Sequence, residues 1–169
     1  MFYERLENKA VKCNLCPHRC VVQDSKRGIC GVRENRNGTL YSLVYGKVVA
    51  RAADPIEKKP LFHFFPGTEI YSIATVGCNF RCLNCQNYEI SQMPRERNGL
   101  IVGEEVTPEE VVSETIKFGC TSIAYTYTEP TIFFEFAYDT AKLANKKGLR
   151  NVFVTDGYIT EEALKKISP

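Results

Sequence analysis

Three cysteines lie within eight residues in the stretch TVGCNFRCLNC, at positions Cys78, Cys82 and Cys85. Thiolates are ligands for zinc and for iron–sulfur clusters, and both kinds of site ordinarily use four protein ligands. A four-iron cluster held by three thiolates keeps one iron without a protein ligand, and such an open position lets a metal site bind a substrate or cofactor. Three clustered thiols are therefore compatible with a four-iron cluster that has one open iron. The alternatives are a zinc knuckle or three neighbouring thiols without a shared ligand.

A second group of cysteines lies near the start of the chain, in CNLCPHRC and RGICGVR: Cys13, Cys16, Cys20 and Cys30. Four thiolates complete a tetrahedral zinc site or hold a second iron–sulfur cluster without an open position. We expect a structural or electron-relaying role, with structural zinc slightly favoured because a small β module gains much of its folding free energy from a metal. His18 lies in the same loop, and we expect it beside the site because four cysteines already suffice.

The composition limits the expected cellular location and the expected binding partners of the chain. The N-terminal stretch MFYERLENKAVKC is charged and contains no apolar signal region, and no later run is long and apolar enough to span a membrane. We therefore expect a cytoplasmic protein without a membrane partner, where a reducing environment favours metal-binding cysteines over disulfides. The net charge is +2 and basic residues are mixed with acidic ones, so we do not expect nucleic acid as a partner.

Two regions of different composition must position these residues. The first, residues 1–67, contains the N-terminal cysteines, a β-rich stretch with an Asn37-Gly38 hairpin turn, and the proline-rich connector DPIEKKPLFHFFPG. We interpret it as a Cys-rich metal-binding β module with its connector. The second region, residues 68–169, alternates short apolar runs with amphipathic segments. The domain boundary is predicted near Gly67.

The second region is predicted to alternate strands and helices. The expected strands cover residues 70–77, 121–127 and 151–157, and the expected helices cover 107–119, 131–148 and 160–168. The first and third helices begin with a threonine cap, and the first also has a capping-box sequence. This order is typical of an α/β fold with parallel strands joined by right-handed crossovers. Ligands of such sheets bind at the carboxyl ends of the strands, where Cys78, Glu129 and Asp156 fall.

The spacing C-x3-C-x2-C after the first strand of the second region resembles the radical S-adenosylmethionine superfamily. In that family the three thiolates hold a [4Fe-4S] cluster, and the amino and carboxylate groups of S-adenosylmethionine bind the open iron. An electron from the cluster breaks a carbon–sulfur bond, which gives methionine and a 5′-deoxyadenosyl radical that abstracts a hydrogen atom. The resemblance implies that Cys78, Cys82 and Cys85 hold such a cluster and that S-adenosylmethionine and an electron donor are partners.

Shorter stretches extend the resemblance to the cofactor contacts. Thr128 and Glu129 in TYTEPT lie where family members carry a Gly-Gly-Glu-like stretch that receives the amino group of S-adenosylmethionine. By itself, Glu129 before Pro130 is equally typical of a helix start favoured by the helix dipole. Asp156 in VTDGY replaces the Asn of a Thr-Asn-Gly stretch found in pyruvate formate-lyase activating enzymes. The resemblance implies cofactor-binding roles for Thr128, Glu129 and Asp156, and it assigns no catalytic side chain.

A narrower resemblance covers nearly the whole chain. The stretch KKPLFHFFPG, followed by IYSIATVGCNFRCLNCQNYEIS, is similar to the activase-like branch called the AmmeMemoRadiSam system radical enzyme. It implies an enzyme that removes a hydrogen atom from an unidentified substrate. Glycyl-radical-type protein activation is one candidate reaction, and a protein is one candidate substrate. The rival functions are a zinc-dependent interaction or nucleic-acid module, which predicts a basic face, and a ferredoxin-like electron carrier, which predicts two complete sets of four cysteines.

The resemblance also implies a larger barrel than these residues supply. Family members resemble a six-unit partial (β/α) barrel, and at about 30 residues per unit the chain covers three units, with about 90 residues absent after Pro169. We therefore expect the N-terminal part of a partial barrel whose third strand has an unpaired edge at Val152 and Val154. A C-terminal companion segment or self-association is expected to complete the cofactor site.

Overall fold

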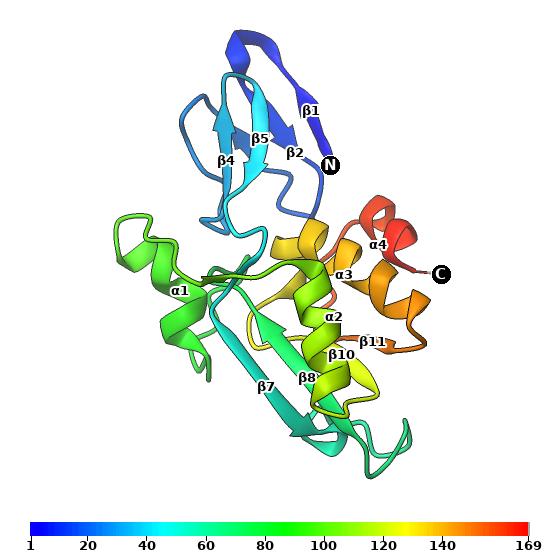
Figure 1. The fold of residues 1–169 in the computed structure, drawn as a ribbon. Coiled ribbons are helices and arrows are strands. Elements are labelled where there is room, and N and C mark those ends of the chain that lie inside the picture. Colours follow the sequence, from blue (N-terminus) through cyan, green and yellow to red (C-terminus); the bar gives the residue numbers. More distant parts are fainter. Residues whose placement is uncertain (169) are drawn as a thin grey trace.

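The computed structural model describes residues 1–168 and centres on a four-stranded sheet with the order β11-β10-β8-β7 (Figure 1). Its strands are β7 (Ala50–Pro55), β8 (Glu69–Ala74), β10 (Ser122–Tyr125) and β11 (Arg150–Phe153). β8, β10 and β11 run parallel, as the alternating pattern predicts, and β7 pairs antiparallel with β8. Within residues 1–168, β11 pairs with β10 alone and forms one edge of the sheet. The carboxyl ends of three neighbouring strands therefore meet at one end of the sheet.

Helices α2 (Pro108–Lys117) and α3 (Phe134–Lys146) connect the parallel strands and pack against each other (Figure 1). The predicted capping box is present: Thr107 Oγ1 accepts from the Glu110 N–H at 3.2 Å, and Glu110 Oε2 accepts from the Thr107 N–H at 2.7 Å. A short 3-10 helix, η3 (Pro130–Phe133), leads into α3. The chain is therefore an α/β structure after residue 68. No helix within residues 1–168 has the length and apolar character needed to cross a membrane.

The main hydrophobic core lies between the sheet and these two helices. Tyr71 and Ile73 of β8 and Ile123 of β10 share this core with apolar side chains of α2 and α3. Successive side chains of a strand point to opposite faces, so Ile70 and Ser72 lie on the face turned away from α2 and α3. That second face carries only a small apolar cluster around Ile70. Polar side chains are therefore tolerated there.

The N-terminal residues form two small sheets. One contains β1 (Tyr3–Arg5), β2 (Val11–Cys13) and β3 (Val21–Val22), with the 3-10 helix η1 (Glu7–Lys9) between the first two strands. The other is the hairpin of β4 (Arg33–Arg36) and β5 (Thr39–Ser42), as the sequence predicts. The turn residues Asn37 and Gly38 have φ values of 52° and 78°, the left-handed geometry that a type I′ hairpin turn requires.

Further contacts join the N-terminal residues to the second region. β6 (Lys47–Val48) pairs with β9 (Glu104–Glu105). Helix α4 (Glu161–Ile167) shares an apolar cluster with the N-terminal strands and lies beside them (Figure 1). Thr160, the predicted cap of α4, fulfils that role, and its hydroxyl also donates to the Asn14 carbonyl at 2.8 Å. The two regions therefore share both backbone pairing and packing.

Strand β7 lies before Gly67 in the chain, yet it belongs to the central sheet. The sequence pattern places residues 50–55 with the N-terminal module, whereas the structure pairs all six of them with β8. The 3-10 helix η2 (Ile56–Lys58) follows β7. Cys30 and Val32, also from the first region, lie in the main core. The division at Gly67 stays a prediction, and the structure adds that residues on both sides of it form one sheet and one core.

Helix α1 (Tyr88–Glu96) follows the cysteine loop and is absent from the predicted elements. Pro94 lies inside α1, where a missing N–H and a bulky ring normally interrupt a helix. Here the Ile90 carbonyl, which loses that intrahelical partner, accepts from the Gly77 N–H at 3.0 Å instead. Gly77 has a φ of 95°, and a Cβ at this position would lie 2.4 Å from Val32, so only glycine fits. The carbonyl that Pro94 leaves without a partner in the helix therefore joins α1 to the cysteine loop.

A buried ion pair crosses between the two regions. Arg33 of β4 and Glu135 of α3 have side chains that are 4% and 15% exposed. Arg33 Nη1 donates to Glu135 Oε1 at 3.1 Å and Nη2 donates to Oε2, so the contact is bidentate. Burial raises the pKa of the Glu135 carboxyl, but the Arg33 guanidinium outweighs it and lowers that pKa below its usual value. The pair is therefore ionised at neutral pH.

Candidate functional site

A cleft of about 700 Å³ lies at the carboxyl ends of the parallel strands. It is lined by all the residues that the sequence predicts to bind the open cluster and its cofactor, which are Cys78, Cys82, Cys85, Thr128, Glu129 and Asp156. The cysteines come from the loop after β8, while the other three residues come from the loops after β10 and β11. The parallel topology therefore explains how residues far apart in the sequence line one cavity.

The three cysteines of this cleft differ in exposure. Cys78 is buried, Cys85 is half-buried and Cys82 is exposed. The Phe80 N–H donates to Cys78 Sγ at 3.4 Å. Burial raises the pKa of the Cys78 thiol above its usual value, and two nearby carboxylates add to the rise. Cys78 is therefore a neutral thiol near pH 7 until a bound metal displaces its proton.

The cysteines of the cleft line one open space without converging on one point. Within residues 1–168, no three His, Cys, Asp or Glu side chains converge closely enough to hold one metal ion. A zinc ion needs donors at about 2.0–2.3 Å from one centre. The thiolates of a four-iron cluster each bind a different iron and therefore remain farther apart. Three thiols around one open cleft match that second requirement.

Helix α1 holds the cysteine loop in place through two polar side chains. Arg95 donates to the carbonyls of Cys78 and Phe80, each at 3.0 Å, and its Nε donates to the Ile29 carbonyl at 2.9 Å. Gln92 Nε2 donates to the same Phe80 carbonyl at 3.1 Å. No sequence motif marks these two side chains, and the proline inside α1 argues against a helix. The one sequence signal for α1 is the Asn-Gly pair that follows it, since glycine commonly ends helices.

Glu129 is 3% exposed and accepts several hydrogen bonds. Its Oε1 accepts from the Thr131 N–H at 3.1 Å, from Thr131 Oγ1 at 2.6 Å and from Thr155 Oγ1 at 2.7 Å. Its Oε2 accepts from the Asp156 N–H at 2.9 Å. These bonds join the loops after β10 and β11, and the bond from Thr131 is the helix-start contact that the alternative interpretation predicts. Because Oε2 accepts only one hydrogen bond and the residue lines the cleft, a ligand contact through Oε2 is compatible with this role.

Thr128 and Asp156 occupy the other predicted cofactor positions. Thr128 is 5% exposed, and its hydroxyl donates to the Thr75 carbonyl at 2.9 Å, which ties the loop after β10 to the cysteine loop. Asp156 is exposed, and its carboxylate accepts no hydrogen bond from residues 1–168. The cleft therefore contains one carboxylate that is held by the protein and a second that is available to a cation.

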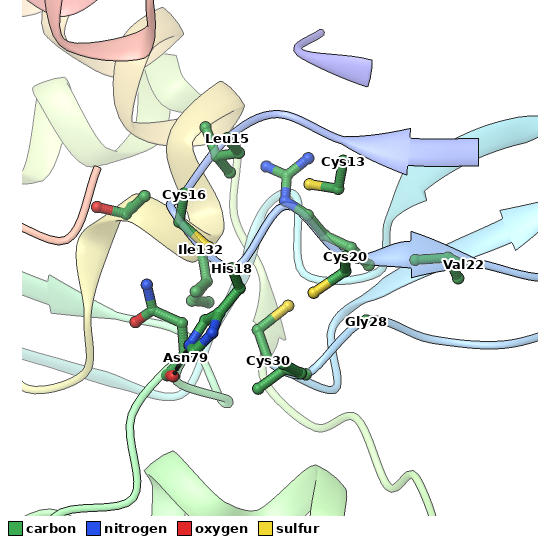
Figure 2. Close-up of a pocket in the computed structure, with 13 residues that line it drawn as sticks. Cys13, Leu15, Cys16, His18, Cys20, Val22, Gly28, Cys30, Asn79 and Ile132 are labelled. Carbon is green, nitrogen blue, oxygen red and sulfur yellow. Dashed lines mark hydrogen bonds between the residues drawn. The ribbon is translucent and has the colours of Figure 1, made fainter. Parts of the chain in front are cut away.

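The four N-terminal cysteines line a separate small cavity beside Asn79 of the cysteine loop (Figure 2). Its volume is about 20 Å³, which is room for roughly one water-sized sphere. Burial raises the pKa of the Cys30 thiol to about 11 and also raises the pKa values of Cys13 and Cys16. In Figure 2 the labelled cysteines surround the same space. The four thiols therefore border one small space, although within residues 1–168 no three of them converge on a single centre.

Arg33, the partner of Glu135 in the buried ion pair, also lines this small cavity. Its Nε is buried and has no hydrogen-bond partner within residues 1–168. A metal ion held by four thiolates carries a net negative charge, so its sulfur atoms would supply the acceptor that Nε lacks. The four cysteine thiols and the neighbouring Arg33 guanidinium are therefore compatible with a thiolate-bound metal.

His18 lies between the two cysteine groups. Its Nε2 is 2.8 Å from the Asn79 carbonyl, and its ring packs against Tyr158 with the ring centroids 4.9 Å apart. Figure 2 shows His18 and Asn79 side by side at the edge of the small cavity. Cys120, which belongs to neither group, is buried in the main core. The N-terminal cysteines are therefore in contact with the loop that carries Cys78.

Comparisons with known proteins identify the second region of the chain. A family model described as "Radical SAM superfamily" matches residues 72–169. "Uncharacterized protein MJ0808" from Methanocaldococcus jannaschii is 52% identical over 167 residues, which cover 99% of this chain and 49% of that protein. "Uncharacterized protein MJ0674" from the same organism is 32% identical over 91 residues, which cover 53% of this chain and 22% of that protein. The chain thus spans about half the length of the first relative. No solved structure matches the chain.

Proposed function

The chain belongs to the radical SAM superfamily, and on this premise we propose that it holds a [4Fe-4S] cluster and binds S-adenosylmethionine in the large cleft. The observation that carries the proposal is that three thiols and the loops of Glu129 and Asp156 meet in one cavity at the carboxyl ends of three parallel strands. Its volume of about 700 Å³ lies within the range of about 300–1,000 Å³ that is usual for cofactor pockets.

The side chains of the cleft have separate tasks in this proposal. The thiolates of Cys78, Cys82 and Cys85 anchor the cluster and leave one iron for the amino-acid group of the cofactor. Glu129 and Asp156 receive the ammonium of that group, because an ammonium in a partly dry site needs a charged acceptor. When bound, the cluster supplies the electron that cleaves a carbon–sulfur bond of S-adenosylmethionine. This chemistry would serve the proposed overall reaction, which is removal of a hydrogen atom from a substrate.

We also propose that the enzyme is activase-like, related to pyruvate formate-lyase activating enzymes and to the AmmeMemoRadiSam branch. The stretch VTDGY carries the resemblance to the activating enzymes, and KKPLFHFFPG with IYSIATVGCNFRCLNCQNYEIS carries the resemblance to the AmmeMemoRadiSam branch. All three stretches contribute residues to the cleft. The cysteine loop is accessible from outside, since Cys82 is exposed and the Leu83 side chain protrudes fully into solvent. An electron-donor protein and a protein substrate are therefore the partners that we propose.

The N-terminal cysteines are proposed to hold a second metal, either zinc or an iron–sulfur cluster. The small cavity supports a single ion, although the four thiols must first rotate toward one centre. The unpaired Arg33 Nε supports a negatively charged metal site. The contact between His18 and Asn79 supports a role in bracing the cysteine loop or in relaying electrons to it.

We propose that a further strand covers the β11 edge and supplies additional cofactor contacts, from a companion segment or from a second copy of the chain. β11 pairs with β10 alone within residues 1–168, and Val154 after it is 39% exposed. Parallel strands are normally covered on both sides.

Replacing Glu129 with glutamine tests the proposed cofactor contact. Glutamine keeps the side-chain length and one oxygen acceptor but removes the negative charge that pairs with the cofactor ammonium. A hydrogen bond to a charged group contributes about 1.5–3 kcal/mol, so we expect the affinity for S-adenosylmethionine to fall about 10- to 100-fold. Equilibrium dialysis of the cluster-loaded protein measures this affinity, and the iron content is expected to stay at the wild-type level.

The matched control is Glu109→Gln, which changes a first-turn carboxylate of α2 that does not line the cleft. This control is expected to bind S-adenosylmethionine as the wild type does. If Glu129→Gln also keeps the wild-type affinity, the carboxylate serves only to start η3 and the proposed ammonium contact is wrong.

A further inference from the structure

Two lysines of the large cleft share one carboxylate. Asp54 Oδ1 accepts from Lys58 Nζ at 2.6 Å, and Asp54 Oδ2 accepts from Lys59 Nζ at 3.0 Å. The same Oδ2 also accepts from Ser72 Oγ at 2.9 Å and from the Tyr127 hydroxyl at 2.8 Å. Four donors therefore surround Asp54, and it has little capacity to neutralise a further charge.

One carboxylate against two ammonium groups leaves one positive charge without a counter-ion. Within residues 1–168, the only ion pairs and hydrogen bonds of Lys58 and Lys59 side chains are those to Asp54. The Lys58 side chain is 59% exposed and is therefore hydrated, whereas the Lys59 side chain is only 5% exposed. The two ammonium groups share the excess positive charge, and at Lys59 little water is present to compensate it.

The Lys59 ammonium also has unused donors. An ammonium carries three N–H groups, and only the bond to Asp54 uses one of them. The Tyr127 ring lies 4.7 Å from Lys59 Nζ and provides cation–π stabilisation, which does not replace a counter-ion. Tyr127 has a φ of 62°, a left-handed conformation that is uncommon for a residue with a side chain. Its carbonyl accepts from Asn87 Nδ2 at 2.9 Å, so this conformation is held in place.

These groups border the proposed cofactor site. Lys58, Lys59 and Tyr127 line the same cleft as Cys78 and Glu129. Ser72, which also contacts Asp54, lies on the sheet face turned away from α2 and α3, where the apolar cluster is small. The cleft therefore contains carboxylates in the loops after β10 and β11 and an excess of positive charge beside β7. A ligand with both a cationic and an anionic part, or two ligands of opposite charge, matches this distribution.

We propose that Lys59, assisted by Lys58, forms an anion-binding subsite that holds a carboxylate or phosphate group of the molecule that loses the hydrogen atom. The assignment of this molecule rests on the proposed function, in which the open iron and Glu129 already bind the amino-acid group of S-adenosylmethionine. Lys59 is then a binding residue for the substrate, and the charge of the substrate is predicted to be negative near its reacting end. The presence of an anion site in the cleft rests on the contacts of Lys59 alone.

The test measures anion binding directly, with inorganic phosphate and succinate as separate probes. Isothermal titration of the cluster-loaded protein is expected to show binding of at least one probe to the wild type. The affinity is expected to fall at least tenfold in Lys59→Met and less than threefold in Lys59→Arg. Lys117→Met, which removes an exposed lysine of α2, is expected to bind the probe as the wild type does. The dissociation constant of S-adenosylmethionine, measured in parallel, is expected to change less than twofold in Lys59→Met.

A second measurement uses the unaltered protein, in case Lys59→Met does not fold. The bound probe is expected to slow acetylation of Lys59 relative to Lys117, as read by mass spectrometry. The proposal is overturned if neither probe binds the wild type, if Lys59→Met binds it equally well, or if Lys59 is not protected. It is also overturned if Lys59→Met loses S-adenosylmethionine instead, because the cofactor carboxylate would then be the ligand. If the wild type binds the probe through Lys59 but never binds S-adenosylmethionine, the anion subsite stands and the proposed function falls.

Discussion

Replacing Cys78, Cys82 and Cys85 together with alanine is expected to abolish the four-iron cluster of the large cleft, and with it the part of the brown chromophore that this cluster contributes in the anaerobically reconstituted protein. These thiols line the large cleft and are the proposed anchors of the four-iron cluster. The loss should be complete, because Asn79 and Phe80 between the first two cysteines offer no thiolate replacement. Iron content and the visible absorption spectrum measure the effect. Binding of S-adenosylmethionine should be lost with the cluster, because the open iron is its main proposed contact.

The N-terminal metal is expected to remain in this triple variant, since Cys13, Cys16, Cys20 and Cys30 line a separate cavity. A combined count of iron and zinc per chain therefore distinguishes the two sites. Cys120→Ala is the matched control, because Cys120 is buried in the main core and belongs to neither group. If the triple variant keeps its full iron content and colour, the assignment of the cluster to this loop is wrong.

Replacing Arg33 with methionine is expected to lower the free energy of unfolding by about 3–5 kcal/mol, because Glu135 is left as a buried charge without its main partner. The N-terminal ammonium lies 3.6 Å from Glu135 Oε1 and replaces only part of this interaction. Urea unfolding of the metal-loaded protein at neutral pH measures the change. The loss should appear in both regions, since the pair joins β4 to α3.

Two comparisons separate the ion pair from other effects of the substitution. The double variant Arg33→Met with Glu135→Met is expected to recover the part of the loss that comes from Glu135, because Glu135 is then no longer a buried charge without a partner. Arg36→Met removes a neighbouring arginine whose side chain is 57% exposed, and it should cost about 1 kcal/mol or less. If Arg33→Met costs no more than Arg36→Met, the buried pair does not stabilise the contact between the regions.

The stability that the Arg33–Glu135 pair contributes is expected to depend on pH in one direction. The folded-state pKa of Glu135 is lowered from its ordinary value of 4.5, so the ionised carboxylate contributes stability above that pH. This contribution to stability is lost as the pH falls through the lowered folded-state pKa of Glu135. The stability difference between the wild type and Arg33→Met is therefore expected to narrow in acid, where the variant no longer carries an unpaired carboxylate.

Features of the fold that depend on neighbouring residues could be predicted from the sequence. The capping box of Thr107 and Glu110 and the turn at Asn37 and Gly38 arise from contacts within four residues, so their geometry hardly depends on the rest of the chain. The sequence also allowed us to predict that the residues of the cleft lie close together, for a different reason. Parallel strands place the loops that follow them at one end of the sheet, wherever those loops lie in the sequence.

Features that depend on distant partners could not be predicted. Helix α1 tolerates Pro94 because Gly77 donates to the carbonyl that the proline leaves free, and no local pattern reveals that donor. Strand β7 belongs to the central sheet through pairing with β8, although its composition matches the preceding β module. The network of Asp54, Lys59 and Tyr127 likewise joins segments that no motif connects. In each case a long-range hydrogen bond decides the structure.

The measurement that tests the account most directly is the electron paramagnetic resonance spectrum of the dithionite-reduced, cluster-loaded protein with and without S-adenosylmethionine. The cofactor is proposed to bind the iron that Cys78, Cys82 and Cys85 leave open, so the signal of the reduced four-iron cluster is expected to change shape and position when S-adenosylmethionine is added. The Cys78, Cys82 and Cys85 triple variant should give no such signal. A reduced four-iron cluster whose spectrum stays the same at saturating S-adenosylmethionine would contradict the account.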